Sequence, residues 1–224
     1  MLASFLQTAS VVIAAISVAI GVTAWRRSAL GQKRFELAER VYELFLEARD
    51  AFSHIRSPFG YGGEGSTRNK REGETEEETQ LLNNAYVAIE RYNNKAEVFS
   101  KLIPLKHRFS LYFGKETAEP FTELTSIINE IFLASRQLSR SWRDQGRSPM
   151  SPEEFEKHLE RMHRAEGVFW EGAEDPDLLK QRIDAMVAKI ERTCESVINP
   201  RRNIRTVAAG AFAEGRSFLS FRKM

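Results

Sequence analysis

Apolar residues recur at alternating steps of four and three positions through four long stretches of this 224-residue chain. Such spacing puts one apolar stripe along each helix, and striped helices pack together nearly parallel in bundles and coiled coils. No stretch alternates apolar and polar residues as a half-buried strand does. The sequence therefore predicts an all-α fold, an antiparallel four-helix-bundle-like domain with one extra short helix at about residues 152–165. The stripes run from Leu37 to Ile55, from Leu82 to Ile103, from Phe121 to Trp142 and from Leu179 to Val197.

The first 25 residues contain no charged side chain. A helix of that length spans about 37 Å, and the hydrocarbon core of a membrane is about 30 Å thick. Basic residues follow the stretch and none precedes it, so the positive-inside rule puts the N-terminus outside and the remainder in the cytoplasm. A cleaved signal peptide is the alternative, but it would carry its positive charge ahead of the apolar run. The sequence predicts a transmembrane anchor over residues 1–26 in the inner (plasma) membrane of a bacterium, with Trp25, Arg26 and Arg27 at the membrane interface.

Small residues recur at four-residue spacing inside this stretch, at Ala15, Ala19 and Thr23. Faces of this kind let helices approach closely in lipid, which favours a homo-oligomer. The alternative is that alanine and glycine are simply common in membrane helices.

The charge balance limits the class of partner. The chain has 33 lysines and arginines against 31 aspartates and glutamates, so it lacks the broad basic field of a nucleic-acid-binding protein. Its single cysteine, Cys194, excludes a disulfide framework and a cysteine-based metal site. Cys194 falls on an apolar stripe and is expected to be a small buried residue. We expect no cofactor and no metal.

Residues 200–224 form a basic, amphipathic tail that includes Arg201, Arg202 and Arg205. Such a segment is drawn to anionic lipid on the cytoplasmic side of a membrane. The alternatives are a free terminus and a terminus docked on a partner.

Several residues carry the chemistry of helix starts. Thr75 with Glu78, and Ser151 with Glu154, have the spacing of a capping box. Asp175, followed by Pro176, is expected to cap the last helix in the same way.

The connection over residues 57–75 is rich in glycine and in charged residues. A phosphate-binding loop needs a preceding strand, a Gly-Lys-Ser/Thr ending and a helix directly after it, and this connection has none of them. The stretch is long for a link between two helices. We interpret it as a tether or, less favoured, as a partner-binding loop. The candidate binding residues are Phe59, Tyr61, Gly62, Gly63 and Arg68.

The sequence "RDAFSH" places Arg49 five residues before His54. This spelling resembles the short motif of the HEPN ribonuclease superfamily, which is also a helical bundle. The resemblance implies that the two side chains cleave RNA without a metal, in a composite site across a dimer. The family places its motif late in the bundle, whereas here it lies in the first cytosolic helix. Five residues of helix also turn about 140°, so a solvated arginine and a histidine at a helix end are the alternative.

Glu154 and His158 lie one turn apart on the extra short helix, with His163 beyond them. Two ligands on one helix face do not complete a metal site, which needs further donors. The pattern is more typical of a polar amphipathic helix.

These features together predict a single-pass membrane protein with an anchor over residues 1–26, a cytosolic bundle over 27–199 and the tail over 200–224. Its expected role is that of a non-catalytic scaffold, assembly, sensor or effector module that contacts membrane lipid and either a protein partner or further copies of itself. A nucleic-acid partner is not expected, and a small-molecule ligand is left open. The alternative function is a membrane-tethered, HEPN-like ribonuclease that uses Arg49 and His54, for example in bacterial defence.

Overall fold

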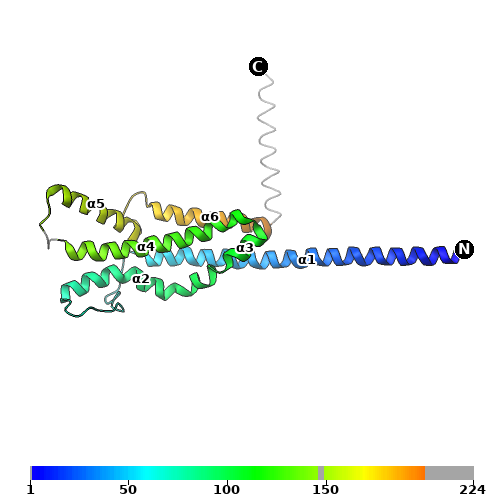
Figure 1. The fold of residues 1–224 in the computed structure, drawn as a ribbon, viewed down its shortest axis with the longest axis horizontal. Coiled ribbons are helices and arrows are strands. Elements are labelled where there is room, and N and C mark those ends of the chain that lie inside the picture. The colour runs from blue at the N-terminus through cyan, green and yellow to red at the C-terminus, as the bar shows by residue number, and fades with distance from the viewer. Residues whose placement is uncertain (1, 146–148, 200–224) are drawn as a thin grey trace, which may run out of the picture. The chain divides into compact units, whose positions relative to one another are not determined.

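The computed structural model describes the backbone of residues 2–145 and 149–199, and the side chains in these ranges except those of residues 2–13 and 15. The described chain is all-helical and contains no strand, which confirms the predicted fold class (Figure 1). Its elements are α1 (Leu2–Ile55), α2 (Glu76–Leu102), α3 (Leu105–Phe113), the short 3₁₀ helix η1 (Lys115–Ala118), α4 (Glu119–Asp144), α5 (Pro152–Phe169) and α6 (Leu178–Ile198).

The chain divides into two units, one of residues 1–40 and 195–224 and the other of residues 41–194. The second unit is the helical bundle. In it α4 packs against α2 and α5 (Figure 1). Phe45 of α1 meets Phe121 of α4 edge-on, with ring centroids 5.0 Å apart. Phe52 of α1 lies 5.3 Å from Phe99 of α2. All four rings are buried, and each contributes about 2–3 kcal/mol to folding through its removal from water.

The predicted stripes form much of this core. The stripe residues of the bundle that become buried are Val41, Leu44, Ala48, Ala51, Ile55, Leu82, Ala85, Phe99, Phe121, Leu124, Ile128, Ile131, Ser135, Leu138, Leu179, Ile183, Met186 and Ile190. The predicted extra helix is also present, although it runs on to Phe169.

The helix starts predicted at Thr75 and Ser151 are confirmed. The Thr75 hydroxyl accepts a hydrogen bond from the Glu78 amide at 3.2 Å. Ser151 and Glu154 form a reciprocal capping box. The prediction of a cap at Asp175 is wrong.

The last helix starts two residues later than predicted because a different carboxylate caps it. Asp177 accepts the hydrogen bond of the Lys180 amide at 2.8 Å, and α6 begins at Leu178. The same carboxylate is an ion-pair partner of the buried Arg56. This tertiary contact fixes where the helix begins.

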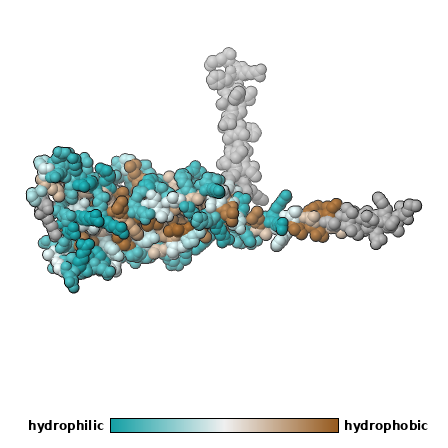
Figure 2. All heavy atoms as spheres, viewed as in Figure 1, coloured by the Kyte–Doolittle hydropathy of each residue, from teal (hydrophilic) through white to brown (hydrophobic). Residues whose placement is uncertain are grey.

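The other unit contains the N-terminal part of α1. Its aliphatic side chains from residue 16 to residue 22 are exposed, with Ile16, Val18 and Ile20 at 54, 66 and 63%, whereas Leu37 and Ala38 are buried. Figure 2 shows one hydrophobic stretch along this segment and a more hydrophilic one after it, whereas most of the bundle surface is hydrophilic. Across the described residues, no helix offers an apolar run of the length that membrane crossing requires.

The predicted anchor and tail fall mostly beyond the description. The side chains of residues 2–13 and 15 lie outside the described residues, and so does the tail with Arg201, Arg202 and Arg205. The described side chains therefore give the anchor no support, and lipid contact by the tail stays a prediction.

Candidate functional site

One buried arginine of α2 holds the first half of the glycine-rich connection against that helix. The Arg91 side chain is 3% exposed. It donates hydrogen bonds to the carbonyl oxygens of His54, Ser57 and Phe59 at 3.2, 2.6 and 2.8 Å. It also donates to both carboxylate oxygens of Glu64, at 3.2 and 2.6 Å. A guanidinium group has five N–H donors, so Arg91 is fully occupied by the chain itself.

A second arginine holds the other half of the connection. Arg68 forms a bidentate ion pair with Glu74 at 2.9 and 2.6 Å and donates to the side-chain oxygen of Asn83 at 3.3 Å. Glu74 also accepts from the Arg71 amide at 2.9 Å. The Arg68 guanidinium first, and then this amide, hold the pKa of Glu74 at about 2. The connection is therefore braced at both ends and is not a free tether, contrary to our favoured interpretation.

The Glu74 carboxylate gives the brace a pH dependence. Its pKa in the folded protein is about 2 against an ordinary 4.5, so the stability it contributes is present above pH 4.5 and is lost as the pH falls toward 2. The difference in unfolding free energy between the wild type and Glu74→Gln is expected to have its largest value at pH 6 and to vanish near pH 2. Urea unfolding across this range measures it. A difference that stays constant with pH would contradict the assignment.

Gly65 brings the connection into direct contact with α2. Its φ is +80°, and a Cβ atom there would lie 2.0 Å from the backbone oxygen of Asn83. Gly63 has a similar φ of +92° but no atom within 4 Å of its Cβ position. Of these two glycines, Gly65 alone requires glycine for space as well as for conformation.

These two glycines form a matched pair of substitutions. Gly63→Ala is expected to cost about 1–2 kcal/mol, the penalty of a left-handed backbone for alanine. Gly65→Ala is expected to cost more and to displace the connection, because α2 backbone occupies the space of the new methyl group. Urea unfolding of both variants checks this order. Equal costs would mean that the close contact is absent in solution.

Two aromatic side chains stand exposed on this braced segment. Phe59 is 84% exposed and Tyr61 is 85% exposed. Tyr61, Gly62 and Gly63 also line a cavity of about 710 Å³, whose other walls include Trp142 of α4 and Trp170 after α5. Of the predicted partner-binding residues, these three line the cavity, Phe59 lies exposed in the same segment, and Arg68 is a structural brace.

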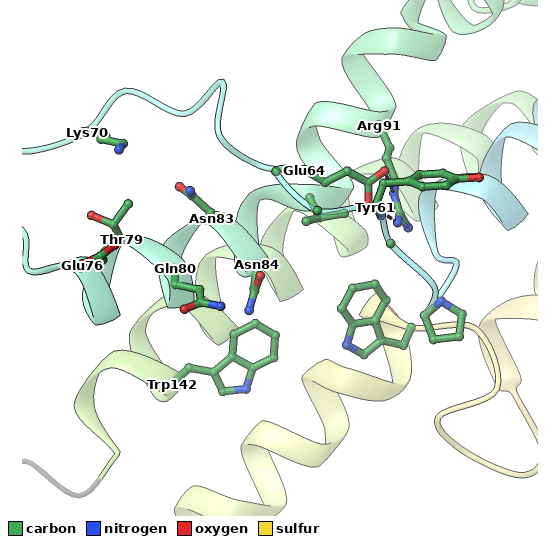
Figure 3. Close-up of a pocket in the computed structure, with 16 residues that line it drawn as sticks. Tyr61, Glu64, Lys70, Glu76, Thr79, Gln80, Asn83, Asn84, Arg91 and Trp142 are labelled. Carbon is green, nitrogen blue, oxygen red and sulfur yellow. Dashed lines mark hydrogen bonds and ion pairs between the residues drawn. The ribbon is translucent and has the colours of Figure 1, made fainter.

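The wall that α2 contributes to this cavity is rich in side-chain amides. Gln80, Asn83 and Asn84 line it together with Thr79. Figure 3 shows Gln80 and Asn84 from α2 and Trp142 from α4 around the same opening. Amides donate and accept hydrogen bonds, so this wall fits a polar, uncharged group such as a peptide backbone.

The charges around the cavity are nearly balanced. Hydrogen bonds from Arg91 lower the pKa of Glu64, and the Glu64 carboxylate stays ionised and paired with that arginine (Figure 3). The remaining charged side chains of the lining are Lys70 and Glu76, of opposite sign. The cavity therefore presents no strong field to a ligand of either sign.

A third arginine fixes the segment that carries Trp170. Arg56 is 1% exposed and pairs with both oxygens of Asp177 at 3.0 and 3.1 Å. It also donates to the carbonyl oxygens of Gly167, Val168 and Trp170 at 2.9, 2.9 and 3.2 Å. We call this contact the Arg56 brace. It links the end of α1 to the connection between α5 and α6.

Asp177 remains ionised in this brace. Burial opposes its ionisation, but the amides of Lys180 and Gly172, followed by Arg56, outweigh burial and lower its pKa below the ordinary value.

The structure does not bring Arg49 and His54 together. Arg49 is about half exposed, bonds to the adjacent Asp50 at 3.3 Å and lines a small cavity with residues of α6. His54 instead has Arg91, Lys95 and Glu64 as its charged neighbours, and burial together with the two cations outweighs Glu64 and lowers the pKa of His54. The two side chains therefore lie in different surroundings.

Two further expectations concern buried groups. Cys194 is 1% exposed, and burial raises its pKa to about 12, which confirms its prediction as a small buried residue. His158 is only 9% exposed and shares the buried face of α5 with Met162, Ala165 and Phe169, as in an amphipathic helix. Within the described ranges, no group of three or more His, Cys, Asp or Glu side chains is placed to hold a metal ion.

Sequence reasoning missed the residues that build the site. Arg56 and Arg91 read as ordinary exposed arginines, and Trp142 reads as the end of a core stripe. The glycines and the exposed aromatics were the only usable signal.

Comparison with known proteins gives no match: no family model fits the chain, and no curated protein or solved structure matches it.

Proposed function

We propose that this protein is a single-pass, membrane-anchored and non-catalytic binding module whose cytoplasmic bundle presents residues 57–75 to a partner protein. One observation carries the proposal. Phe59 and Tyr61 are more than four-fifths exposed on a segment whose bracing arginine has no free donor. Large aromatic side chains on a fixed backbone lose little conformational entropy on binding, and such residues often dominate protein interfaces.

The partner chemistry that fits is an extended peptide segment. The amides of Gln80, Asn83 and Asn84 can pair with its backbone, while Tyr61 and Trp142 can pack on its side chains. The near-balanced charge of the lining favours a neutral or mixed sequence over a strongly charged one.

The membrane anchor belongs to the proposal. The uncharged first 25 residues, followed directly by Arg26 and Arg27, support an anchor with its N-terminus outside and the bundle in the cytoplasm. The small-residue face supports self-association of anchors.

Photo-crosslinking in native membranes tests the proposal. A photoreactive phenylalanine analogue replaces Tyr61 in the full chain, and the same analogue replaces Leu111, an 82% exposed residue of α3, as the matched control. We expect one discrete heterologous adduct from position 61 and none from position 111, and we expect Gly65→Ala to abolish it. No adduct, equal adducts from both positions, or an adduct of twice the chain mass would each contradict a separate protein partner at this site.

A further inference from the structure

A second cavity, of about 600 Å³, lies between α4 and α5 in the bundle. Arg136 and Arg140 reach it from α4, one helical turn apart, and Arg161 reaches it from α5. Within the described residues, none of these three arginines forms an ion pair. Arg161 donates its Nε hydrogen to the carbonyl oxygen of Lys157 at 3.1 Å, which leaves its terminal nitrogens for a ligand.

The charge around this cavity is not compensated by its own lining. Asp144 is the one acidic side chain among the described residues that line it, and Arg143 already pairs with it at 2.9 Å. Two arginines four residues apart on a helix also repel each other. A bound anion would offset this repulsion.

One residue in the wall of this cavity carries a buried polar atom that lacks a partner. His158 lines it, is more than nine-tenths buried, and has a ring Nε2 atom with no hydrogen bond. A buried polar atom of this kind is normally satisfied by the protein, by water or by a ligand. It is an observation independent of the arginines, and it lies in the wall that they surround.

The geometry points to a binding site for a small phosphorylated anion in this cavity. Its volume is that of a small-molecule site. A guanidinium group matches the oxygens of phosphate in a bidentate way, and three of them in one cavity match two or more phosphate charges better than a single carboxylate. A long nucleic-acid strand fits less well, because the chain has a formal net charge of only +2. The phosphates can belong to a soluble molecule or to a lipid headgroup.

The test uses the full chain in nanodiscs and has two arms. In the first, nanodiscs of neutral lipid receive inorganic pyrophosphate, with sulfate at equal ionic strength as the reference. In the second, the nanodiscs contain a phosphatidylinositol phosphate and no soluble phosphate. Calorimetry gives the affinity in the first arm, and thermal unfolding of the bundle reports binding in both.

We expect saturable binding in at least one arm, which also identifies the source of the phosphate. Arg136→Gln with Arg140→Gln is expected to weaken binding at least tenfold. The matched control replaces two exposed cations elsewhere, Arg108→Gln with Lys115→Gln, and is expected to retain binding. Because none of these four side chains forms an ion pair among the described residues, both variants are expected to fold.

The NMR signals of the histidine rings show where the ligand binds. Binding in the cavity is expected to shift the signals of His158 and to leave those of His107, on the exposed surface of α3, unchanged. Absence of binding in both arms, equal loss in the two double variants, or unshifted His158 signals on binding would overturn the proposal.

Discussion

Arg91→Met is expected to lower the free energy of unfolding of the bundle by about 3 kcal/mol, the range found when one partner of a buried ion pair is removed. Methionine has a similar length, so the substitution removes the hydrogen bonds without opening a large cavity. It leaves the carbonyl oxygens of Ser57 and Phe59 and the carboxylate of Glu64 without their donor. The loss is therefore expected to exceed that of an ordinary surface substitution several-fold.

Urea unfolding followed by circular dichroism measures this loss. Arg108→Met, at an exposed position of α3, is the control and is expected to change the unfolding free energy by less than about 0.5 kcal/mol. A double-mutant cycle with Glu64→Gln isolates the ion pair, and a coupling of about 1–3 kcal/mol is expected for groups in one network. A loss near that of the control would show that Arg91 is not the brace in solution.

Arg56→Met is expected to have the largest effect of any single substitution discussed, a loss of about 3–5 kcal/mol. Arg56 is 1% exposed and its partner Asp177 is 9% exposed, so the substitution leaves a nearly buried carboxylate without its cation. The carbonyl oxygens of Gly167, Val168 and Trp170 lose a donor as well. The connection that carries Trp170 is expected to loosen.

The pH dependence separates this brace from simple packing. Asp177 has a lowered pKa in the folded protein, so the stability it contributes is present above its ordinary value of 3.8 and is lost as the pH falls through the folded value. Asp177→Asn is therefore expected to show a shallower loss of stability below about pH 4 than the wild type. Removing Arg56 raises the pKa of Asp177. The loss of stability at low pH is therefore expected to begin at a higher pH than in the wild type. If both variants lost stability at low pH in the same way as the wild type, the ion pair would be contradicted.

The bundle could be predicted from the sequence because it depends on local periodicity. Residues such as Leu44, Ala48 and Leu124 fall on stripes that any helix would turn toward a neighbour, and they are buried. The start of α5 was equally predictable, because Ser151 and Glu154 satisfy free amides within a single turn.

The site could not be predicted in the same way, because it depends on contacts between distant segments. Arg91 is buried only because residues 54–64 fold over it and offer their carbonyl oxygens. Asp177 caps α6 in place of Asp175 while it also pairs with Arg56, 121 residues away in the sequence. No spacing rule for a single helix contains such information.

Hydrogen exchange of residues 57–75 shows whether this segment is rigid before any partner binds, which the proposed binding surface requires. The Tyr61, Thr67 and Arg71 amides donate to the carboxylates of Glu64, Glu90 and Glu74. We expect these amides to exchange at least about a hundredfold more slowly than in an unstructured peptide, as in a segment that opens only by local unfolding. We also expect Arg91→Met to remove the protection at Tyr61 while amides in the core of α4 stay protected. Exchange at the unstructured rate in the wild type would mean that Phe59 and Tyr61 are exposed on a mobile segment, and the proposed binding surface would not exist.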